Sequence, residues 1–342
     1  MRDRPRARRS TGGGAVSLSQ LGEFAVIDRI TARIRPDDRV LVGPGDDAAV
    51  IRLTGPDIVV STDALIEGVH FRRDWSEAVE VGRKAVAVNV ADIEAMGADP
   101  VAIVVALSVP SDLDVEWVDR LSEGIVAEAE AAGVSLVGGD LSRAPVVMIA
   151  VTVFGDLAGR SPVLRSGARA GQVLAMRGRL GWSAAGFIAL SRGFRSPRDA
   201  VAAHRVPQVP YGAGAVAAAA GATAMIDISD GLMADLGHLA RASGVVCDVR
   251  SDSLEVTDPI RAVAAATGSD PLVLILTGGE DHALVAGFEP GAVPQDWQVI
   301  GELRAPGAGA AAGEVLVDGA AWEGNAGFEH FAEPRRAGGG AR

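Results

Sequence analysis

Ala224-Met225-Ile226-Asp227-Ile228-Ser229-Asp230-Gly231 is an apolar run that leads into two aspartates and a glycine. A segment with the apolar spacing of a helix follows at residues 232–242. The same order recurs where apolar runs lead into acidic residues, at 39–47, 57–63, 134–140 and 272–281. The pattern predicts five strands that end in carboxylates and are separated by helices, which indicates an α/β or α+β architecture.

The spacing of apolar residues predicts further helices. They cover residues 23–34, 79–96, 112–132, 183–192, 213–220 and 259–267. On the helix at 79–96, Asn89 and Asp92 stand three positions apart and therefore share a face. The longest apolar run, 101–109, ends at Pro110 and is predicted to be a buried strand, because a span of the bilayer needs about 18–20 apolar residues.

The composition limits the class of protein. The chain has 342 residues, a hydrophobic content of 48% and a formal net charge of −12. At roughly 100–200 residues per domain, this length indicates two domains, and the Gly-, Pro- and Arg-rich stretch 155–171 marks the expected boundary. The acidic balance argues against nucleic acid as a partner, because a phosphate backbone requires a basic surface. The Arg-rich stretch 2–9 lacks the apolar core of a signal peptide, so we expect a cytoplasmic protein.

Two residue types are scarce. Lys84 is the only lysine, and its context, Gly82-Arg83-Lys84-Ala85, lacks the Gly-Lys-Ser/Thr order of a Walker phosphate loop. The glycine loop, strand lysine and His-Arg-Asp loop of protein kinases are absent from the sequence as well. Cys247 is the only cysteine, which excludes an intrachain disulfide and a cysteine-based zinc site, and we expect its side chain to be buried.

The recurring aspartates point to a metal site. A single aspartate after a strand usually marks only a turn, but the carboxyl ends of strands are also where α/β folds place ligands. Clustered carboxylates repel one another unless cations neutralise them, and their hard oxygen atoms favour Mg²⁺. Because Mg²⁺ commonly shares its coordination sphere with substrate phosphates, and because glycines admit phosphate close to backbone N–H groups, the sequence predicts a metal–nucleotide site.

The motifs that carry these residues follow one another in a recognisable order. They are Gly45-Asp46-Asp47-Ala48-Ala49, Ser61-Thr62-Asp63 with His70-Phe71, residues 87–92 with 95–98, Gly138-Gly139-Asp140, Arg165-Ser166-Gly167-Ala168, residues 226–232 and Gly278-Gly279-Glu280-Asp281. Over residues 22–331 this ordered set closely resembles the thiamine-monophosphate kinase family. That family belongs to the aminoimidazole-ribonucleotide-synthetase-like ATP-binding superfamily.

The resemblance implies a two-domain aminoimidazole-ribonucleotide-synthetase-like fold. A mixed N-terminal sheet with helices would pair with a second subunit in a dimeric β-barrel, and the C-terminal domain would be a layered α/β unit. The implied boundaries are a disordered basic tail at 1–20, an N-terminal ATP/Mg-binding and dimerisation domain at 21–157, a C-terminal α/β domain at 158–331 and a disordered tail at 332–342.

The resemblance also implies roles for the residues at matching positions. Several Mg²⁺ ions would be held by Asp47, Thr62, Asp63, Asp92, Asp140, Asp227 and Asp230. ATP would lie against Gly139, Asp140, Arg165 and Ser229. Thiamine monophosphate would be bound by His70, Glu280 and Trp322, with the indole of Trp322 stacked on the thiazolium ring.

The implied reaction is the phosphorylation of thiamine monophosphate to thiamine diphosphate by ATP and magnesium. The acceptor is a phosphate oxygen that is already anionic near neutral pH, because its second pKa is about 6. We therefore expect direct in-line transfer with no side chain acting as nucleophile or general base. Cations between the two polyanions would reduce their mutual repulsion.

Other functions fit parts of the pattern. Aminoimidazole ribonucleotide synthetase shares the superfamily and its use of ATP, and the motif wording alone weighs against it. Selenophosphate synthetase is disfavoured because no cysteine lies near the N-terminus, and the hydrogenase-maturation dehydratase because no cysteine ends the chain. A non-catalytic acidic metal-binding module would bind metal without nucleotide, and a metal-dependent phosphatase would release phosphate without ATP.

Overall fold

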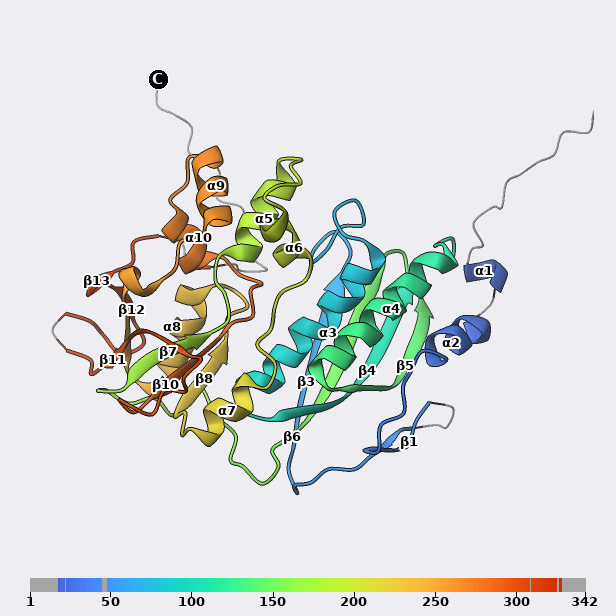
Figure 1. Ribbon diagram of the computed structural model, residues 1–342, viewed down its shortest axis with the longest axis horizontal. Coiled ribbons are helices and arrows are strands. Elements are labelled where there is room, and N and C mark those ends of the chain that lie inside the picture. The colour runs from blue at the N-terminus through green and yellow to red at the C-terminus, as the bar shows by residue number, and fades with distance from the viewer. Residues whose placement is uncertain (1–17, 22, 45–47, 308, 325, 328–342) are drawn as a thin grey trace, which may run out of the picture.

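The computed structural model describes residues 18–21, 23–44, 48–307, 309–324 and 326–327 (Figure 1). Most of the predicted tail at 1–20 and all of the tail at 332–342 lie outside the described residues. Residues 18–20 belong to a short helix whose Leu18 is buried. Within the described residues, no single helix has both the length and the apolar character to cross a membrane. Only the two helices Asp258–Thr267 and Pro271–Thr277, taken together across a sharp bend, meet those criteria.

The described part of the chain contains both helices and strands. The helices are α1 (Leu18–Leu21), α2 (Glu23–Thr31), α3 (Ala78–Ala95), α4 (Val115–Ala132), α5 (Trp182–Ser191), α6 (Arg198–Arg205), α7 (Ala213–Ala219), α8 (Leu232–Ser243), α9 (Asp258–Thr267) and α10 (Pro271–Thr277), with the 3₁₀ turn η1 (Ser251–Ser253). The strands are β1 (Val40–Val42), β2 (Val50–Ile51), β3 (Ile58–Ile66), β4 (Asp99–Val109), β5 (Ser135–Arg143), β6 (Met148–Asp156), β7 (Val173–Arg177), β8 (Ala224–Asp227), β9 (Val246–Val249), β10 (Leu284–Phe288), β11 (Gln298–Arg304), β12 (Val315–Val317) and β13 (Ala320–Ala321).

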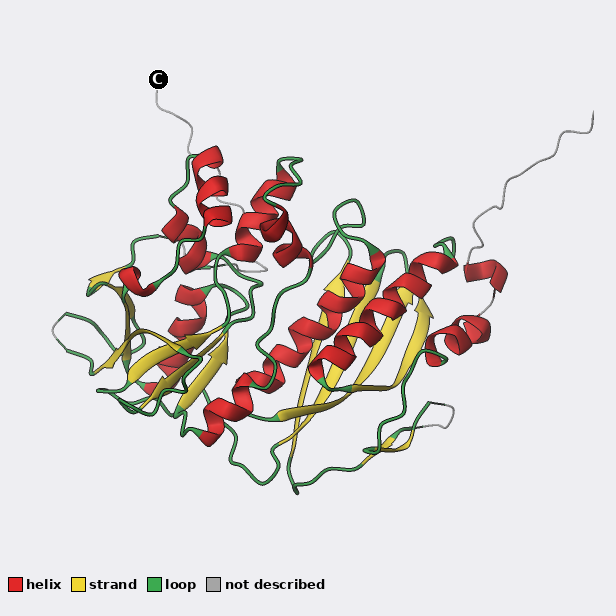
Figure 2. Ribbon diagram, in the orientation of Figure 1, coloured by secondary structure: helices red, strands yellow, loops and turns green. Residues whose placement is uncertain are grey.

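The first large sheet has the strand order β3-β6-β4-β5 and is mixed, because β4 and β5 run parallel while the other pairs are antiparallel. Helices α3 and α4 lie over one face of it (Figure 2). Side chains alternate along β6 between buried residues such as Val151, which face the helices, and half-buried residues such as Ala150. The burial pattern therefore leaves one face of this sheet open.

Two glycines bring α3 and α4 into close contact. A Cβ atom at Gly82 would lie 2.1 Å from the Leu121 carbonyl oxygen, and one at Gly124 would lie 2.1 Å from the Val79 carbonyl oxygen. Any larger residue at either position would push the two backbones apart. The glycines thus set the close spacing of α3 and α4.

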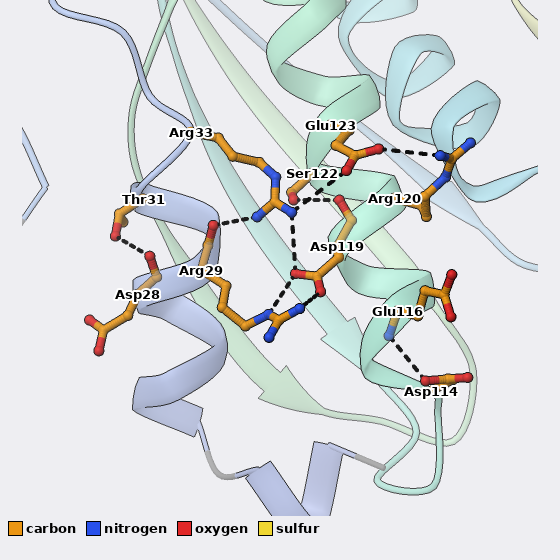
Figure 3. A network of polar contacts seen from close by, with 10 residues as sticks. All are labelled: Asp28, Arg29, Thr31, Arg33, Asp114, Glu116, Asp119, Arg120, Ser122 and Glu123. Atoms are coloured by element: carbon orange, nitrogen blue, oxygen red, sulfur yellow. Dashed lines mark hydrogen bonds and ion pairs between the residues drawn. The ribbon is translucent and has the colours of Figure 1, made fainter. Parts of the chain in front are cut away.

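Ion pairs join helix α2 to α4, in addition to the apolar contacts of α2 with the core of the first sheet (Figure 3). The guanidinium of Arg29 bonds both carboxylate oxygens of Asp119. The guanidinium of Arg33 lies 3.6 Å from Asp119 and 3.7 Å from Glu123. Because Asp119 is largely buried, these contacts offset the cost of removing its charge from water.

The second large sheet has the order β13-β12-β9-β11-β7-β10-β8, with β9 and β12 as its parallel pair. One face packs through Ile226 and Leu236 against a layer that includes α8, and the other carries a smaller core around Phe288 and Trp297. The structure thus confirms the layered α/β fold class. Cys247 on β9 is buried, as predicted.

Two sequence predictions about local structure are wrong, and one helix was missed. Residues 272–276 form part of helix α10 rather than a strand, because Asp270 caps the helix N-terminus and Pro271 starts its first turn. The motifs Thr62-Asp63 and Gly139-Asp140 lie inside β3 and β5 rather than at strand ends. Helix α6 was not predicted, since its sequence contains a single large apolar residue, Val201.

Candidate active site

A group of carboxylates lies where the C-terminal half of α3 meets β3 and β8. Asn89 and Asp92 face the same way from α3, as predicted. The amide oxygen of Asn89 accepts the backbone N–H of Asp63 at 2.8 Å, and Asp92 accepts the hydroxyl of Ser61 at 2.6 Å. Both contacts fix the end of α3 to β3, and they bring Asp92 and Asp63 together although 29 positions separate them in the sequence.

Asp227, the last residue of β8, completes this group from the second sheet. Burial, followed by the charges of Asp227 and Asp63, raises the pKa of Asp92 to about 6. The imidazole Nδ1 of buried His282 lies 3.0 Å from Asp227 Oδ2. Burial disfavours the charge on His282, but this bond and the charge of Asp227 outweigh it and raise the pKa of His282. The site therefore concentrates negative charge that one imidazole only partly compensates.

The loop after β8 runs into the N-terminus of α8. Asp235 Oδ2 accepts the backbone N–H groups of Asp230 and Gly231 at 3.0 and 3.1 Å, which fixes the first turn of the helix. Burial and the nearby Asp227 raise the pKa of Asp235 to about 7. A Cβ atom at Gly279 would lie 2.4 Å from the Ser229 carbonyl oxygen, so only glycine permits this close approach.

Glu280 follows in the same loop and has an unusual environment. Its backbone N–H donates to the Ser229 carbonyl at 2.7 Å, and its φ of 63° is in the left-handed region that non-glycine residues rarely adopt. The Lys84 ammonium lies 3.1 Å from Glu280 Oε1, and His204 Nδ1 lies 3.4 Å from Oε2. Burial raises the pKa of Glu280, but the charge of Lys84 and its hydrogen bond to the carboxylate outweigh burial and lower it.

The structure does not bring every predicted residue to this group. Thr62 pairs with Thr152, and Asp140 lies in register with Ala106, so both point to the open face of the first sheet, whereas Asp63 points to the face that bears the helices. Three strand spacings, about 14 Å, separate β3 from β5. Asp140 accepts the Ser142 hydroxyl at 2.6 Å.

Three of the other predicted residues make contacts with residues outside this group. Arg165 is exposed, and its carbonyl accepts the Ser243 hydroxyl at the end of α8. His70 accepts the backbone N–H of Ile66 at 3.1 Å through Nδ1. Trp322 packs against the core of the second sheet. Asp47 lies outside the described residues.

The donor atoms suit a hard divalent cation. Within the described ranges, no group of three or more His, Cys, Asp or Glu side chains has the spacing of a metal site. The cluster of Asp63, Asp92 and Asp227 nevertheless presents carboxylate oxygens, which Mg²⁺ prefers, and their mutual repulsion favours binding of a cation.

Sequence reasoning missed three residues that the structure places at this site. They are Lys84, His204 and His282. His282 directly follows the Gly-Gly-Glu-Asp motif, which was a signal that could have been followed. Lys84 is a charged residue on the apolar face of a predicted helix, and its burial could have been anticipated from that position. Nothing local in the sequence identifies His204.

The N-terminal part of the chain matches a known family model. Residues 45–157 match the family described as AIR synthase related protein, N-terminal domain. The hydrogenase maturation protein HypE in complex with ATP has a similar fold, with a TM-score of 0.72, 21% identity and coverage of 90% of this chain and 92% of that chain. The fold and the match of the N-terminal part together define a protein with an AIR synthase-like fold.

More similar relatives identify the family within that class. The thiamine-monophosphate kinase of Mycobacterium tuberculosis is 50% identical over 93% of this chain and 94% of the relative, and that of Corynebacterium glutamicum is 43% identical over 84% and 87%. The structure of AaThiL complexed with AMPPCP and TMP has a TM-score of 0.72 and 32% identity, over 92% of this chain and 99% of that chain. The chain belongs to the thiamine-monophosphate kinase family of enzymes.

Proposed function

We propose that the protein transfers the γ-phosphoryl group of ATP to thiamine monophosphate and releases thiamine diphosphate and ADP. This proposal rests on one observation. The side chains of Asp63 and Asp227 lie close enough to Asp92 for their charges to raise its pKa, although the three residues come from different parts of the chain. Family membership and the AMPPCP and TMP bound by AaThiL support the choice of substrates.

Several Mg²⁺ ions would be held by the carboxylates and one hydroxyl group, namely Asp47, Thr62, Asp63, Asp92, Asp140, Asp227 and Asp230. Bound Mg²⁺ would neutralise phosphate charge on both substrates. The oxygen-only donor set and the repulsion at Asp92 support this assignment. The different sheet faces of Asp63 and Asp140 indicate that they contact different ions or different parts of the nucleotide.

The residues proposed to bind ATP are Gly139, Asp140, Arg165 and Ser229, and those proposed to bind thiamine monophosphate are His70, Glu280 and Trp322. Ser229 lies two residues before Gly231, the N-cap of α8, and the N-terminus of this helix offers N–H groups and a positive dipole end to phosphate. The acceptor oxygen is anionic at neutral pH, so the side chains orient the substrates for in-line attack and need not remove a proton.

A direct assay tests the proposal. The purified protein is incubated with ATP, MgCl₂ and either thiamine monophosphate or formylglycinamidine ribonucleotide, and nucleotides and thiamine phosphates are separated by chromatography. We expect equimolar ADP and thiamine diphosphate with the first acceptor and no product with the second. Reaction with the ribonucleotide would identify a synthetase, phosphate release without ATP a phosphatase, and metal binding without turnover a non-catalytic module.

A second test addresses the mechanism. With γ-³²P-labelled ATP and no acceptor, direct transfer predicts that the protein remains unlabelled. A phosphorylated protein that passes its label to thiamine monophosphate would refute in-line transfer between the two substrates.

We also propose that the protein is a homodimer joined through the open face of the first sheet in a β-barrel. Ile58 and Val60 on β3 are 46% and 52% exposed on that face, so a partner there would bury apolar surface. Sedimentation of the wild type and of V60E tests the assignment, and an unchanged dimer in V60E would refute this interface. The domain boundaries at 157/158 and the cytoplasmic location remain predictions.

A further inference from the structure

Lys84, the only lysine of the chain, is buried on α3 with 2% of its surface exposed. Its ammonium donates to the His70 carbonyl at 3.0 Å, to Glu280 Oε1 at 3.1 Å and to the His204 carbonyl at 3.5 Å. These oxygens match the three N–H donors of an ammonium group. Each N–H group of the Lys84 ammonium therefore has an acceptor within the protein.

The three acceptors come from separate segments. His70 lies in the loop after β3, His204 near the end of α6, and Glu280 in the loop between α10 and β10. One side chain thus joins the first sheet's layer to two elements of the C-terminal half. The planar guanidinium of arginine is larger and directs its donors in a plane, so it would not reproduce this arrangement.

Glu280 is the member of this group that faces outward. About a third of its side chain, 35%, is exposed, while the Lys84 side chain is 3% exposed. The left-handed backbone at Glu280 costs energy and persists only where surrounding contacts hold it. Lys84 supplies such a contact to Oε1 of Glu280. The other carboxylate oxygen, Oε2, lies near His204.

We propose that Lys84 is a positioning residue that holds the Glu280 carboxylate and the His70 segment in the arrangement that binds thiamine monophosphate. The inference rests on the proposed function, because both partners belong to the proposed acceptor site. Its consequence is selective. Loss of the Lys84 ammonium weakens binding of the phosphate acceptor and leaves binding of ATP unchanged.

The test compares K84M with R83M in steady-state kinetics with each substrate varied in turn. Arg83 is the neighbouring residue and pairs with Glu128 at 2.7 Å on α4, away from Glu280. We expect the KM for thiamine monophosphate to rise at least tenfold in K84M, as for loss of a hydrogen bond to a charged group, with the KM for ATP within twofold of wild type. R83M should retain both values.

A double-mutant cycle adds a second measurement. E280Q raises the same KM, and K84M should add little in the E280Q background, because both changes disrupt one arrangement. K84Q is measured in parallel and should show the same split if K84M does not fold. Equal rises in both KM values, an unchanged KM for the acceptor, or full additivity would overturn the proposal. A wild-type protein without kinase activity would instead overturn the proposed function.

Discussion

Asp156, at the end of β6, provides a test of how the first sheet is held together. Its Oδ2 accepts the backbone N–H and the hydroxyl of Thr54, both at 2.6 Å, and its Oδ1 accepts the backbone N–H groups of Gly55 at 3.2 Å and Ala158 at 2.8 Å. Burial raises the pKa of Asp156, but these four donors outweigh it and lower the pKa to about 2.

The size of the effect follows from that pKa. The difference from the ordinary value of 3.8 corresponds to about 2 kcal/mol of folding free energy, at 1.36 kcal/mol per pKa unit. Because the folded-state pKa is the lower one, this stabilisation is complete above about pH 4 and is lost as the pH falls through about 2. In D156N the amide NH₂ would face two of the donors, so the loss at pH 7 should be at least this large.

Urea unfolding of the wild type and D156N between pH 2 and 7, followed by circular dichroism, measures the effect. We expect D156N to be about 2 kcal/mol less stable at pH 7 and the difference to shrink steadily below about pH 4. D57N, which alters an exposed carboxylate near the same turn, is the matched control and should remain close to wild type. A difference between D156N and wild type that stays constant down to pH 2 would refute the charge-based reasoning.

Other perturbations follow from the candidate site. D92N should lower kcat by at least about a hundredfold. Its Tm should be unchanged or higher, because the substitution removes the repulsion between Asp92 and Asp227. A loss of Tm in parallel with kcat, measured by calorimetry, would assign Asp92 a structural role instead. D140N should weaken binding of AMPPCP with Mg²⁺ at least about tenfold by titration calorimetry, and unchanged affinity would remove Asp140 from the proposed ligands. G279A should lower Tm and raise the KM for thiamine monophosphate, because its Cβ would lie 2.4 Å from the Ser229 oxygen; normal kinetics would show that this close approach is dispensable.

The sequence predicted the long helices well because their signal is local and repeated. Helix α3 was expected at 79–96 and observed at Ala78–Ala95, since many consecutive turns carry apolar residues at helical spacing. The apolar run at 272–276 is too short for periodicity to separate strand from helix. The cap at Asp270 and the following proline carried the deciding information there.

The sequence predicted which types of residue form the site. It predicted only in part which of them lie close together. Asp92 and Asp227 were predicted from their motifs, and the structure brings them together. The face to which Asp140 points depends on the register of β5 against β4, including a register shift, which no local pattern records. The contact of Lys84 with Glu280 joins residues 196 positions apart, so it emerges only once both halves have packed.

Several unfavourable features of the fold lie at the candidate site. Asp92 faces like charges, and Glu280 and His282 adopt left-handed backbone with φ of 63° and 53°. By contrast, α3 and α4 pack through paired glycines over a continuous apolar core. The well-packed surroundings hold Glu280 and His282 in their strained conformations, because the neighbouring contacts leave these residues no alternative arrangement. Ligands that neutralise the carboxylates bind the folded state alone and therefore add stability, by about 2.7 kcal/mol at a hundred times their Kd. The like-charged arrangement thus supports the proposal that this site binds cations together with phosphates.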